Sequence, residues 1–286
     1  MPAKSILVTG CSAGGIGAAL AITLAQHGHF VFATARNTSK IPAELSGLSN
    51  VRVIPLDVSS TPSVTEAAKI VNESEHGLDV LVNNAGSGYA MPILDIDIDK
   101  AKEVYEANVW GPVRTIQAFS DMLIKSRGRV VNVSTVGAVL NIPWISTYSS
   151  SKAAFTLQSE ALRLELSPFD VSVLTIMGGI VTSNFHTNDS GAGFKLPSNS
   201  RYTSIQNIIA GWTTGRSKPT AMTAERFSEH ILEDVVGEGK SGVVWKGPHA
   251  GSVKFAKWFM PSSFVDSSVS RGQGLEELER NLSKQR

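Results

Sequence analysis

The stretch that decides the fold is "ILVTGCSAGGIGAAL", residues 6–20. In it a short apolar segment leads into four glycines and then into an alanine-rich run that is typical of a helix. The spacing of Gly10, Gly14, Gly15 and Gly17 fits neither G-x-G-x-x-G nor G-x-x-x-x-G-K-[ST]. Taken alone, the loop is therefore either a phosphate-binding loop or a plain turn.

The rest of the chain alternates short apolar runs with longer helical patterns. Six β-branched runs indicate strands buried on both faces: Ser5–Thr9, Phe30–Thr34, Val51–Leu56, Asp79–Asn84, Gly128–Ser134 and Val171–Met177. A further helix over 223–239 and a short strand over 242–247 extend the pattern. This alternation predicts an α/β fold of the Rossmann type, a doubly wound parallel sheet with helices on both faces.

The domain organisation follows from the length. A chain of 286 residues without a repeat or a linker predicts a single dinucleotide-binding catalytic domain over residues 1–286. Within it we assign residues 184–214 to a substrate loop and residues 245–286 to a C-terminal extension. In such a sheet Gly10 follows a strand and Gly17 opens a helix, where backbone N–H groups bind a pyrophosphate. That context favours a phosphate-binding loop.

Composition narrows the class of partner. Lys and Arg number 26 against 25 Asp and Glu, so no net field attracts nucleic acid. Cys11 is the only cysteine, the start lacks a secretory signal, and no apolar run approaches the ~20 residues of a membrane span. The six histidines form no metal-binding motif. We expect no metal, a small-molecule partner, and an intracellular protein, either cytoplasmic or peripheral to an internal membrane.

Several motifs occur in a fixed order along the chain. They are the loop Thr9 to Gly17, Asp57 in "PLDVSS", "NNAG" over 83–86, Asn108 in "EANVWG" and "YSSSK" over 148–152. With these motifs the sequence resembles the short-chain dehydrogenase/reductase family. Its glycine loop is one residue longer than T-G-x-x-x-G-x-G and is similar to that of the fungal and plant 1-acyldihydroxyacetone-phosphate reductase-like branch.

Tyr148 and Lys152 stand four residues apart and so share one face of a helix. An ammonium beside a phenol favours the phenolate, which predicts a Tyr148 pKa below its usual value near 10. Such a tyrosine gives a proton to a carbonyl oxygen as hydride reaches the carbon. The family resemblance implies that Lys152 also binds the nicotinamide ribose.

Two other catalytic positions leave alternatives open. Counting back from Tyr148 places Thr135 where the family has its carbonyl-orienting serine, and the neighbouring Ser134 fits if the next loop is one residue longer. Either hydroxyl can donate the bond, and register favours Thr135. Asn108 resembles the family's asparagine that holds a water in the proton relay; it is otherwise a helix-kink asparagine bonded to backbone, and both roles are compatible.

The resemblance also implies a set of cofactor contacts. "PGxVxT", which contacts the nicotinamide carboxamide in the family, has Gly178 in place of its proline. After the second strand there is no acid to bind a ribose 2′-OH, and Arg36 stands there instead, which predicts NADP(H) rather than NAD. The predicted cofactor-binding residues are Gly10, Ser12, Gly15, Ile16, Gly17, Arg36, Asp57, Asn84, Ala85, Gly86, Tyr148, Lys152, Val181 and Ser183.

Together these observations predict an NADPH-dependent carbonyl reductase. Its substrate is expected to be small and lipophilic, such as an acyl-dihydroxyacetone phosphate or a secondary-metabolite ketone. The alternative is a catalytically silent NADP(H)-binding scaffold. Trp144 either lines the substrate pocket or packs its loop. The apolar tail after residue 251 caps the pocket, contacts a membrane surface or mediates assembly; we favour the first, and we expect a homo-oligomer.

Overall fold

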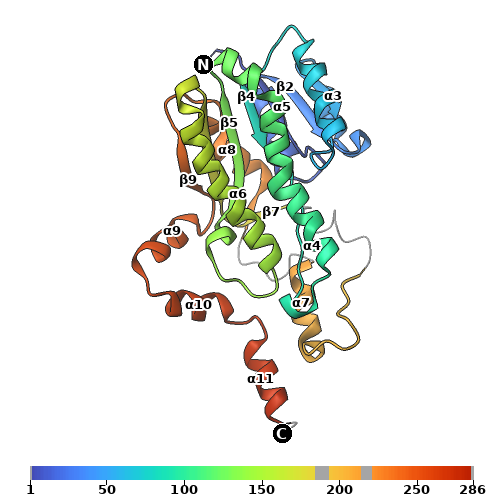
Figure 1. Ribbon diagram of the computed structural model, residues 1–286, viewed down its shortest axis with the longest axis vertical. Coiled ribbons are helices and arrows are strands. Elements are labelled where there is room, and N and C mark those ends of the chain that lie inside the picture. The colour runs from blue at the N-terminus through green and yellow to red at the C-terminus, as the bar shows by residue number, and fades with distance from the viewer. Residues whose placement is uncertain (1, 184–192, 214–220, 285–286) are drawn as a thin grey trace.

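The computed structural model describes residues 2–183, 193–213 and 221–284. Its main sheet has seven parallel strands in the order β3-β2-β1-β4-β5-β6-β9 (Figure 1). Their bounds are β1 (Ser5–Val8), β2 (Phe30–Ala35), β3 (Val51–Pro55), β4 (Val80–Asn83), β5 (Arg129–Thr135), β6 (Ser172–Gly178) and β9 (Gly242–Lys246). The predicted doubly wound fold is confirmed, and the predicted strands lie where the sequence placed them.

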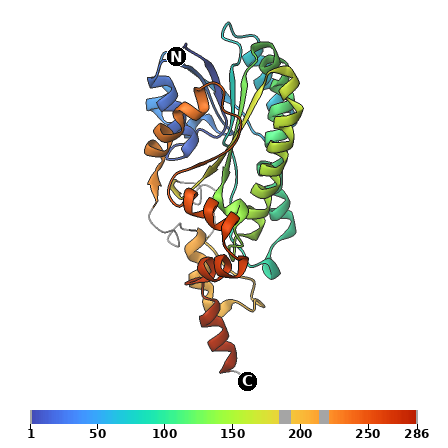
Figure 2. The same ribbon diagram turned by 90° about the vertical axis from the view of Figure 1, so that its left-hand side faces the viewer.

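Helices cover both faces of this sheet, as Figure 2 shows. On one face α1 (Ile16–Gln26) packs with α8 (Ala224–Val236) and the short α2 (Ala43–Ser46); the other carries α3 (Thr61–Asn72), α5 (Gly111–Ser126) and α6 (Ser146–Glu165). Alternate residues of one strand serve the two cores, since Ile6 and Val8 pack on the first side and Leu7 on the second. This two-sided burial explains why the strands are continuous apolar runs.

The strand order reverses between β1 and β4, which pair in parallel with Ile6 opposite Val80. From this point the chain proceeds toward β2 on one side and toward β5 on the other. The loops that follow β1 and β4 therefore diverge at the carboxyl ends of the strands and leave a crevice between them. Both loops carry motifs singled out in the sequence, residues 9–17 and 83–86.

The helical stretch over residues 98–126 is interrupted. Helix α4 (Ile98–Tyr105) continues through a π-helical turn, Glu106–Trp110, into α5. Pro112 follows directly, and a proline lacks the N–H that a helix interior needs. Single π turns inside helices are frequent at functional sites, and Asn108 lies in this one.

The remaining elements lie below the carboxyl ends of the sheet (Figure 1). A small second sheet pairs β7 (Val181–Thr182) with β8 (Met222–Thr223), and the helices here are α7 (Gln206–Thr213), α9 (Ala250–Phe259), α10 (Ser262–Ser270) and α11 (Leu275–Ser283). Short 3₁₀ helices occupy Thr38–Lys40, Ile93–Asp95, Val136–Val139, Ser167–Phe169 and Thr203–Ile205. Because β9 continues to Lys246, the C-terminal extension begins after the sheet rather than at 245. Of the expected substrate loop, residues 184–192 and 214 lie outside the described residues.

No helix in the described ranges is both long and apolar enough to cross a membrane.

Candidate active site

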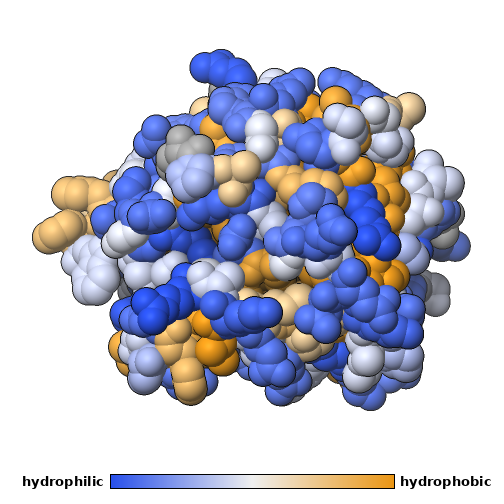
Figure 3. All heavy atoms as spheres, turned by 90° about the horizontal axis from the view of Figure 1, so that it is seen from above, coloured by the Kyte–Doolittle hydropathy of each residue, from blue (hydrophilic) through white to orange (hydrophobic). Residues whose placement is uncertain are grey.

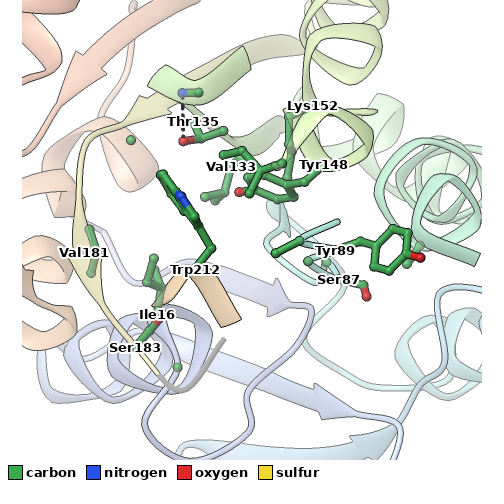
Figure 4. A pocket seen from close by; sticks show the side chains of 18 of the residues that line it. Ile16, Ser87, Tyr89, Val133, Thr135, Tyr148, Lys152, Val181, Ser183 and Trp212 are labelled. Carbon is green, nitrogen blue, oxygen red and sulfur yellow. Dashed lines mark hydrogen bonds between the residues drawn. The ribbon is translucent and has the colours of Figure 1, made fainter. Parts of the chain in front are cut away.

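A cavity of about 1250 Å³ opens at the carboxyl ends of the strands, where the strand order reverses. Its walls come from the glycine loop, the ends of β2, β4, β5 and β6, helix α6 and the C-terminal segment. Figure 4 shows Tyr148, Lys152 and Thr135 on one side of this cavity, with Trp212 projecting into it and Ile16 and Val181 further along. One space therefore joins the predicted cofactor residues other than Gly17 to the predicted catalytic residues other than Asn108.

The glycine loop is shaped so that no side chain fits at its critical points. Gly10 has a φ of +77°, and a Cβ there would lie 2.9 Å from the Ala85 Cα. A Cβ on Gly17 would overlap the Asn84 Nδ2 and the Gly10 carbonyl oxygen. The positive φ and these close approaches require glycine.

Hydrogen bonds hold this loop against its neighbours. The Cys11 N–H donates to the Thr34 carbonyl at 2.8 Å, and the Asn84 Nδ2 donates to the Thr9 carbonyl at 2.8 Å. The Thr9 Oγ1 accepts from the N–H groups of Asn84 and Ala85, both at 3.0 Å. The side chain of Asn84, predicted as a cofactor contact, thus positions the loop as well as lining the cavity.

Helix α1 begins at this loop with its backbone donors uncapped. Its N-cap residue, Gly15, makes no side-chain cap hydrogen bond, and its first turn carries no acid. Ser12, Gly15 and Ile16 all line the cavity. Orphan N–H groups and the positive end of a helix dipole bind anions, so the chain's own atoms fit a pyrophosphate here.

Two cations follow β2 at the same end of the cavity. Arg36 lines it as predicted, and so does Lys40, which the sequence analysis did not single out. The carbonyl of Lys40 accepts the Ala13 N–H at 2.8 Å, which anchors this residue beside the glycine loop. The signal was present in the sequence as a second cation four residues after Arg36. Among the described lining residues Asp57 is the only carboxylate, and its Oδ1 accepts the Ser59 N–H at 3.0 Å.

Tyr148 stands in the first turn of α6, half-buried at the cavity wall. Burial raises its pKa to about 12, and a hydrogen bond with the Thr135 side chain acts in the opposite direction. The expected lowering of the Tyr148 pKa is wrong for this structure, because burial is the largest effect on it. The Lys152 Nζ donates to the Val133 carbonyl at 2.9 Å. Tyr148 therefore carries its proton at neutral pH, the form that donates to a carbonyl oxygen.

Lys152 lies one helical turn beyond Tyr148 and is only 5% exposed. Because burial disfavours the ammonium, its pKa falls to about 8. The Nζ also lies 5.3 Å from the centre of the Phe155 ring. Lys152 thus sits where a modest change of surroundings changes its charge.

Thr135 and Ser134 face different neighbours at the end of β5. The Thr135 hydroxyl accepts the Gly137 N–H at 3.2 Å and is the one bonded to Tyr148 (Figure 4 draws the first bond). The Ser134 hydroxyl is buried and pairs with the Thr156 hydroxyl at 2.7 Å. Both residues border the cavity, but the geometry favours Thr135 as the second donor to a carbonyl.

Asn108 is fully buried behind the cavity wall. Its Oδ1 accepts the Ser87 N–H at 2.8 Å, and its Nδ2 donates to the Ser87 carbonyl and the Ser151 hydroxyl, both at 2.9 Å. Ala107, not Asn108, is among the lining residues. Its side chain therefore ties the π-helical turn to the segment after β4 and to α6, as in the helix-kink interpretation. A role for its backbone in a water relay stays a prediction.

The segment after β6 reaches the cavity, and Val181 and Ser183 both line it. Gly178 belongs to β6 and pairs with Thr135 and with Lys246. Next to it, a Cβ on Gly179 would overlap the Pro248 carbonyl oxygen. The second glycine of this segment is therefore required by the close approach of the chain after β9.

Trp144 packs the loop rather than lining the cavity. It is 6% exposed, has a φ of +71°, and contacts a cluster around Leu196 and Ile209. Its indole N–H donates to the Gln273 carbonyl at 2.9 Å. Trp212, in the expected substrate loop, and Gln273, in the tail expected to cap the pocket, do line the cavity. Neither residue was singled out from the sequence, since no motif connects residues so far apart in the chain.

The last features of the site to consider are the cysteine and the metal-ligating side chains. Cys11 lies in the core, and burial raises its pKa to about 12, so the thiol fills space as expected. Across the ranges that the structure describes, no group of three His, Cys, Asp or Glu side chains could hold a metal ion.

Comparison with known proteins agrees with this geometry. The model of the family described as short chain dehydrogenase matches residues 4–192. The chain belongs to the short-chain dehydrogenase family. Both the predicted family and the predicted enzyme class, an oxidoreductase of this family, are thereby confirmed.

Individual relatives extend over most of the chain. "Short-chain dehydrogenase PC-15" of Penicillium crustosum is 42% identical over 90% of this chain and 92% of its own. The "NADPH-dependent 1-acyldihydroxyacetone phosphate reductase" of Schizosaccharomyces pombe is 34% identical over 83% of this chain and 80% of its own. A short chain dehydrogenase from Burkholderia cenocepacia, solved in complex with NADP, is 22% identical with a TM-score of 0.75, covers 93% of this chain and 97% of its own, and shows the shared fold.

Proposed function

We propose that this short-chain dehydrogenase is an NADPH-dependent carbonyl reductase that converts a ketone or aldehyde to an alcohol on a small, lipophilic substrate. The observation that carries the proposal is the placement of Tyr148 and Thr135 at the wall of the cavity that the glycine loop also lines. Either hydroxyl can donate to a substrate oxygen placed between them.

The choice of cofactor rests on charge at the end of β2. Arg36 and Lys40 line the cavity where an NAD-specific fold carries an acid, and a guanidinium pairs with a phosphate dianion. Two comparisons support the choice, since the Schizosaccharomyces relative is named as NADPH-dependent and the Burkholderia structure contains NADP. The glycine loop and the uncapped start of α1 would hold the pyrophosphate.

When bound, NADPH supplies a hydride to the carbonyl carbon. Tyr148 then gives its proton to the carbonyl oxygen, and the Thr135 hydroxyl orients that oxygen by a hydrogen bond. The phenolate that remains recovers a proton from water. The substrate becomes an alcohol and Tyr148 returns to its neutral form.

The test is a panel of ketones and aldehydes assayed by loss of NADPH absorbance, with the alcohol product identified by mass spectrometry. A reductase consumes NADPH and forms an equal amount of alcohol. The alternative, a catalytically silent scaffold, would bind NADPH in a calorimetric titration and reduce no compound in the panel. That combination would overturn the proposal.

Two exposed apolar surfaces support partners beyond the substrate. On α9 the rings of Phe255, Trp258 and Phe259 are 58%, 72% and 73% exposed, beside Lys254 and Lys257. In Figure 3 apolar side chains project at the left-hand edge, the side on which Figure 1 places α9. Aromatic and basic residues on one short helix suit an anionic membrane surface, and we propose peripheral contact there. Flotation with phosphatidylserine vesicles but not with neutral vesicles would support it.

The second surface is on α6, where Leu157 and Leu164 are 74% and 62% exposed and stand seven residues, about two turns, apart. Large exposed leucines on one helix face favour self-association, and we propose a homo-oligomer built on this face. Light scattering of the parent and of a Leu157→Glu variant measures it. A monomeric parent would exclude the proposal.

A further inference from the structure

Gln273 occupies a turn between α10 and α11 whose shape is fixed by glycine on both sides. Gly272 has a φ of +75° and Gly274 a φ of +84°, which side chains other than glycine rarely adopt. A Cβ on Gly274 would also lie 3.0 Å from the Ile208 Cδ1 of helix α7. The turn is therefore held tightly against α7, and Gln273 lines the same cavity as Tyr148.

Two indoles donate to this one residue from different parts of the chain. The Trp144 Nε1 donates to the Gln273 carbonyl at 2.9 Å, and the Trp212 Nε1 donates to the Gln273 Oε1 at 2.7 Å. An indole nitrogen can only donate, so the atom that faces Trp212 must be the amide oxygen. The orientation of the amide is thereby fixed, and its NH₂ group points away from Trp212.

Among the described residues that NH₂ group has no acceptor. Within the described part of the chain, no hydrogen bond runs from the Gln273 Nε2 to another residue, although the amide carries two N–H groups. Arg271, two residues earlier, also lines the cavity, and Lys195 does so from the segment before α7. The side chains of Arg271 and Lys195 can donate hydrogen bonds and cannot accept them.

We infer that Gln273, with Arg271, forms a polar subsite that binds an acceptor oxygen of the substrate, distant from the carbonyl that is reduced. The inference rests on the proposed function, and it narrows the substrate class. A preferred substrate carries a second oxygen, as carbonyl, hydroxyl or carboxylate, at the far end of an otherwise apolar skeleton. Because the Gln273 amide is already held in one orientation, binding that oxygen costs little side-chain entropy, which favours affinity.

A Gln273→Glu substitution separates this role from a merely structural one. Glutamate keeps an oxygen that accepts from Trp212, so the turn stays in place, but it replaces the amide NH₂ group with a carboxylate oxygen. The matched control is Gln206→Glu. The Gln206 Oε1 likewise accepts a neighbouring N–H, that of Leu196 at 3.2 Å, but Gln206 does not line the cavity. Thermal unfolding of both variants verifies that the fold is retained.

The probes are androstanedione and androstanone, rigid ketones that differ by one distal carbonyl oxygen, titrated calorimetrically into the protein with NADP⁺ present, so that neither ketone is reduced during the titration. We expect the parent and Gln206→Glu to bind the dione about three- to tenfold more tightly, the ratio that one neutral hydrogen bond gives. Gln273→Glu should lose that preference while its affinity for androstanone stays within about twofold. Equal binding of the two ketones by the parent, or an unchanged preference in Gln273→Glu, would overturn the inference. Because binding is measured directly, failure of the reductase proposal would appear separately, as absence of turnover in the carbonyl panel.

Discussion

Burial of Lys152 predicts that the stability of this protein rises with pH in a defined window. The folded-state pKa is about 8, whereas the ordinary value is 10.5. Between those values the unfolded chain binds more protons than the folded chain, so the free energy of unfolding increases as pH rises. Below pH 8 the full cost of burying the ammonium is present. Above about pH 10.5 that cost is gone.

The magnitude follows from the two pKa values. Between pH 7 and pH 9.5 the linkage relation gives a gain of about 2 kcal/mol from this one lysine. Other groups titrate in the same range, so the quantity to measure is the difference between the parent and Lys152→Met, which keeps the length of the chain but carries no charge. The pKa of Tyr148 is about 12, so its own titration lies above this window.

Urea unfolding followed by fluorescence, at several pH values from 7 to about 9.5, provides the assay. The parent should gain about 2 kcal/mol relative to Lys152→Met over that range. A difference that is independent of pH would mean that Lys152 titrates normally and is not held in a desolvated site. A difference that falls with pH would refute the reasoning, because it would require the folded state to favour the ammonium.

The remaining predictions concern the glycine loop, the hydroxyl pair and the cofactor. Gly17→Ala should lower the free energy of unfolding by about 1–3 kcal/mol and weaken NADPH binding. The control, Gly251→Ala, should be neutral or stabilising, because a Cβ there meets nothing within 4 Å. Equal effects of the two substitutions in urea unfolding would contradict a tightly packed glycine loop. Thr135→Val should reduce turnover by about 10²–10³ and Ser134→Ala by much less, and the reverse order would assign the carbonyl donor to Ser134. Arg36→Ala should remove about ten- to hundredfold of the preference for NADPH over NADH in kcat/KM, and an unchanged ratio would exclude a contact with the 2′-phosphate.

The sheet could be predicted from the sequence because its signal is local. Runs such as Val171–Met177 are short and mostly apolar, as expected of a strand covered on both faces, and glycines mark the turn after β1. Tyr148 and Lys152 were placed correctly on one helix face for the same reason, since four residues make one turn.

Properties that depend on distant neighbours could not be predicted in this way. The pKa of Tyr148 is set by burial and by the side chain of Thr135, and neither follows from the spacing of Tyr148 and Lys152. The side-chain amide of Asn108 forms hydrogen bonds with Ser87 and Ser151, which lie in two other segments of the chain. Gln273 is held at the cavity by hydrogen bonds from two indoles and by the two glycines that shape its turn, all of which depend on the folded chain.

The central claim is that Tyr148 delivers the proton to a carbonyl in a cavity that binds NADPH. Tyr148→Phe removes one oxygen and little volume, so the initial rate of NADPH oxidation with the best ketone of the panel is the most direct measurement. The account predicts that this rate falls by at least about 10²-fold while the calorimetric affinity for NADPH stays within about twofold. A Tyr148→Phe protein that reduces the ketone at the rate of the parent would contradict it.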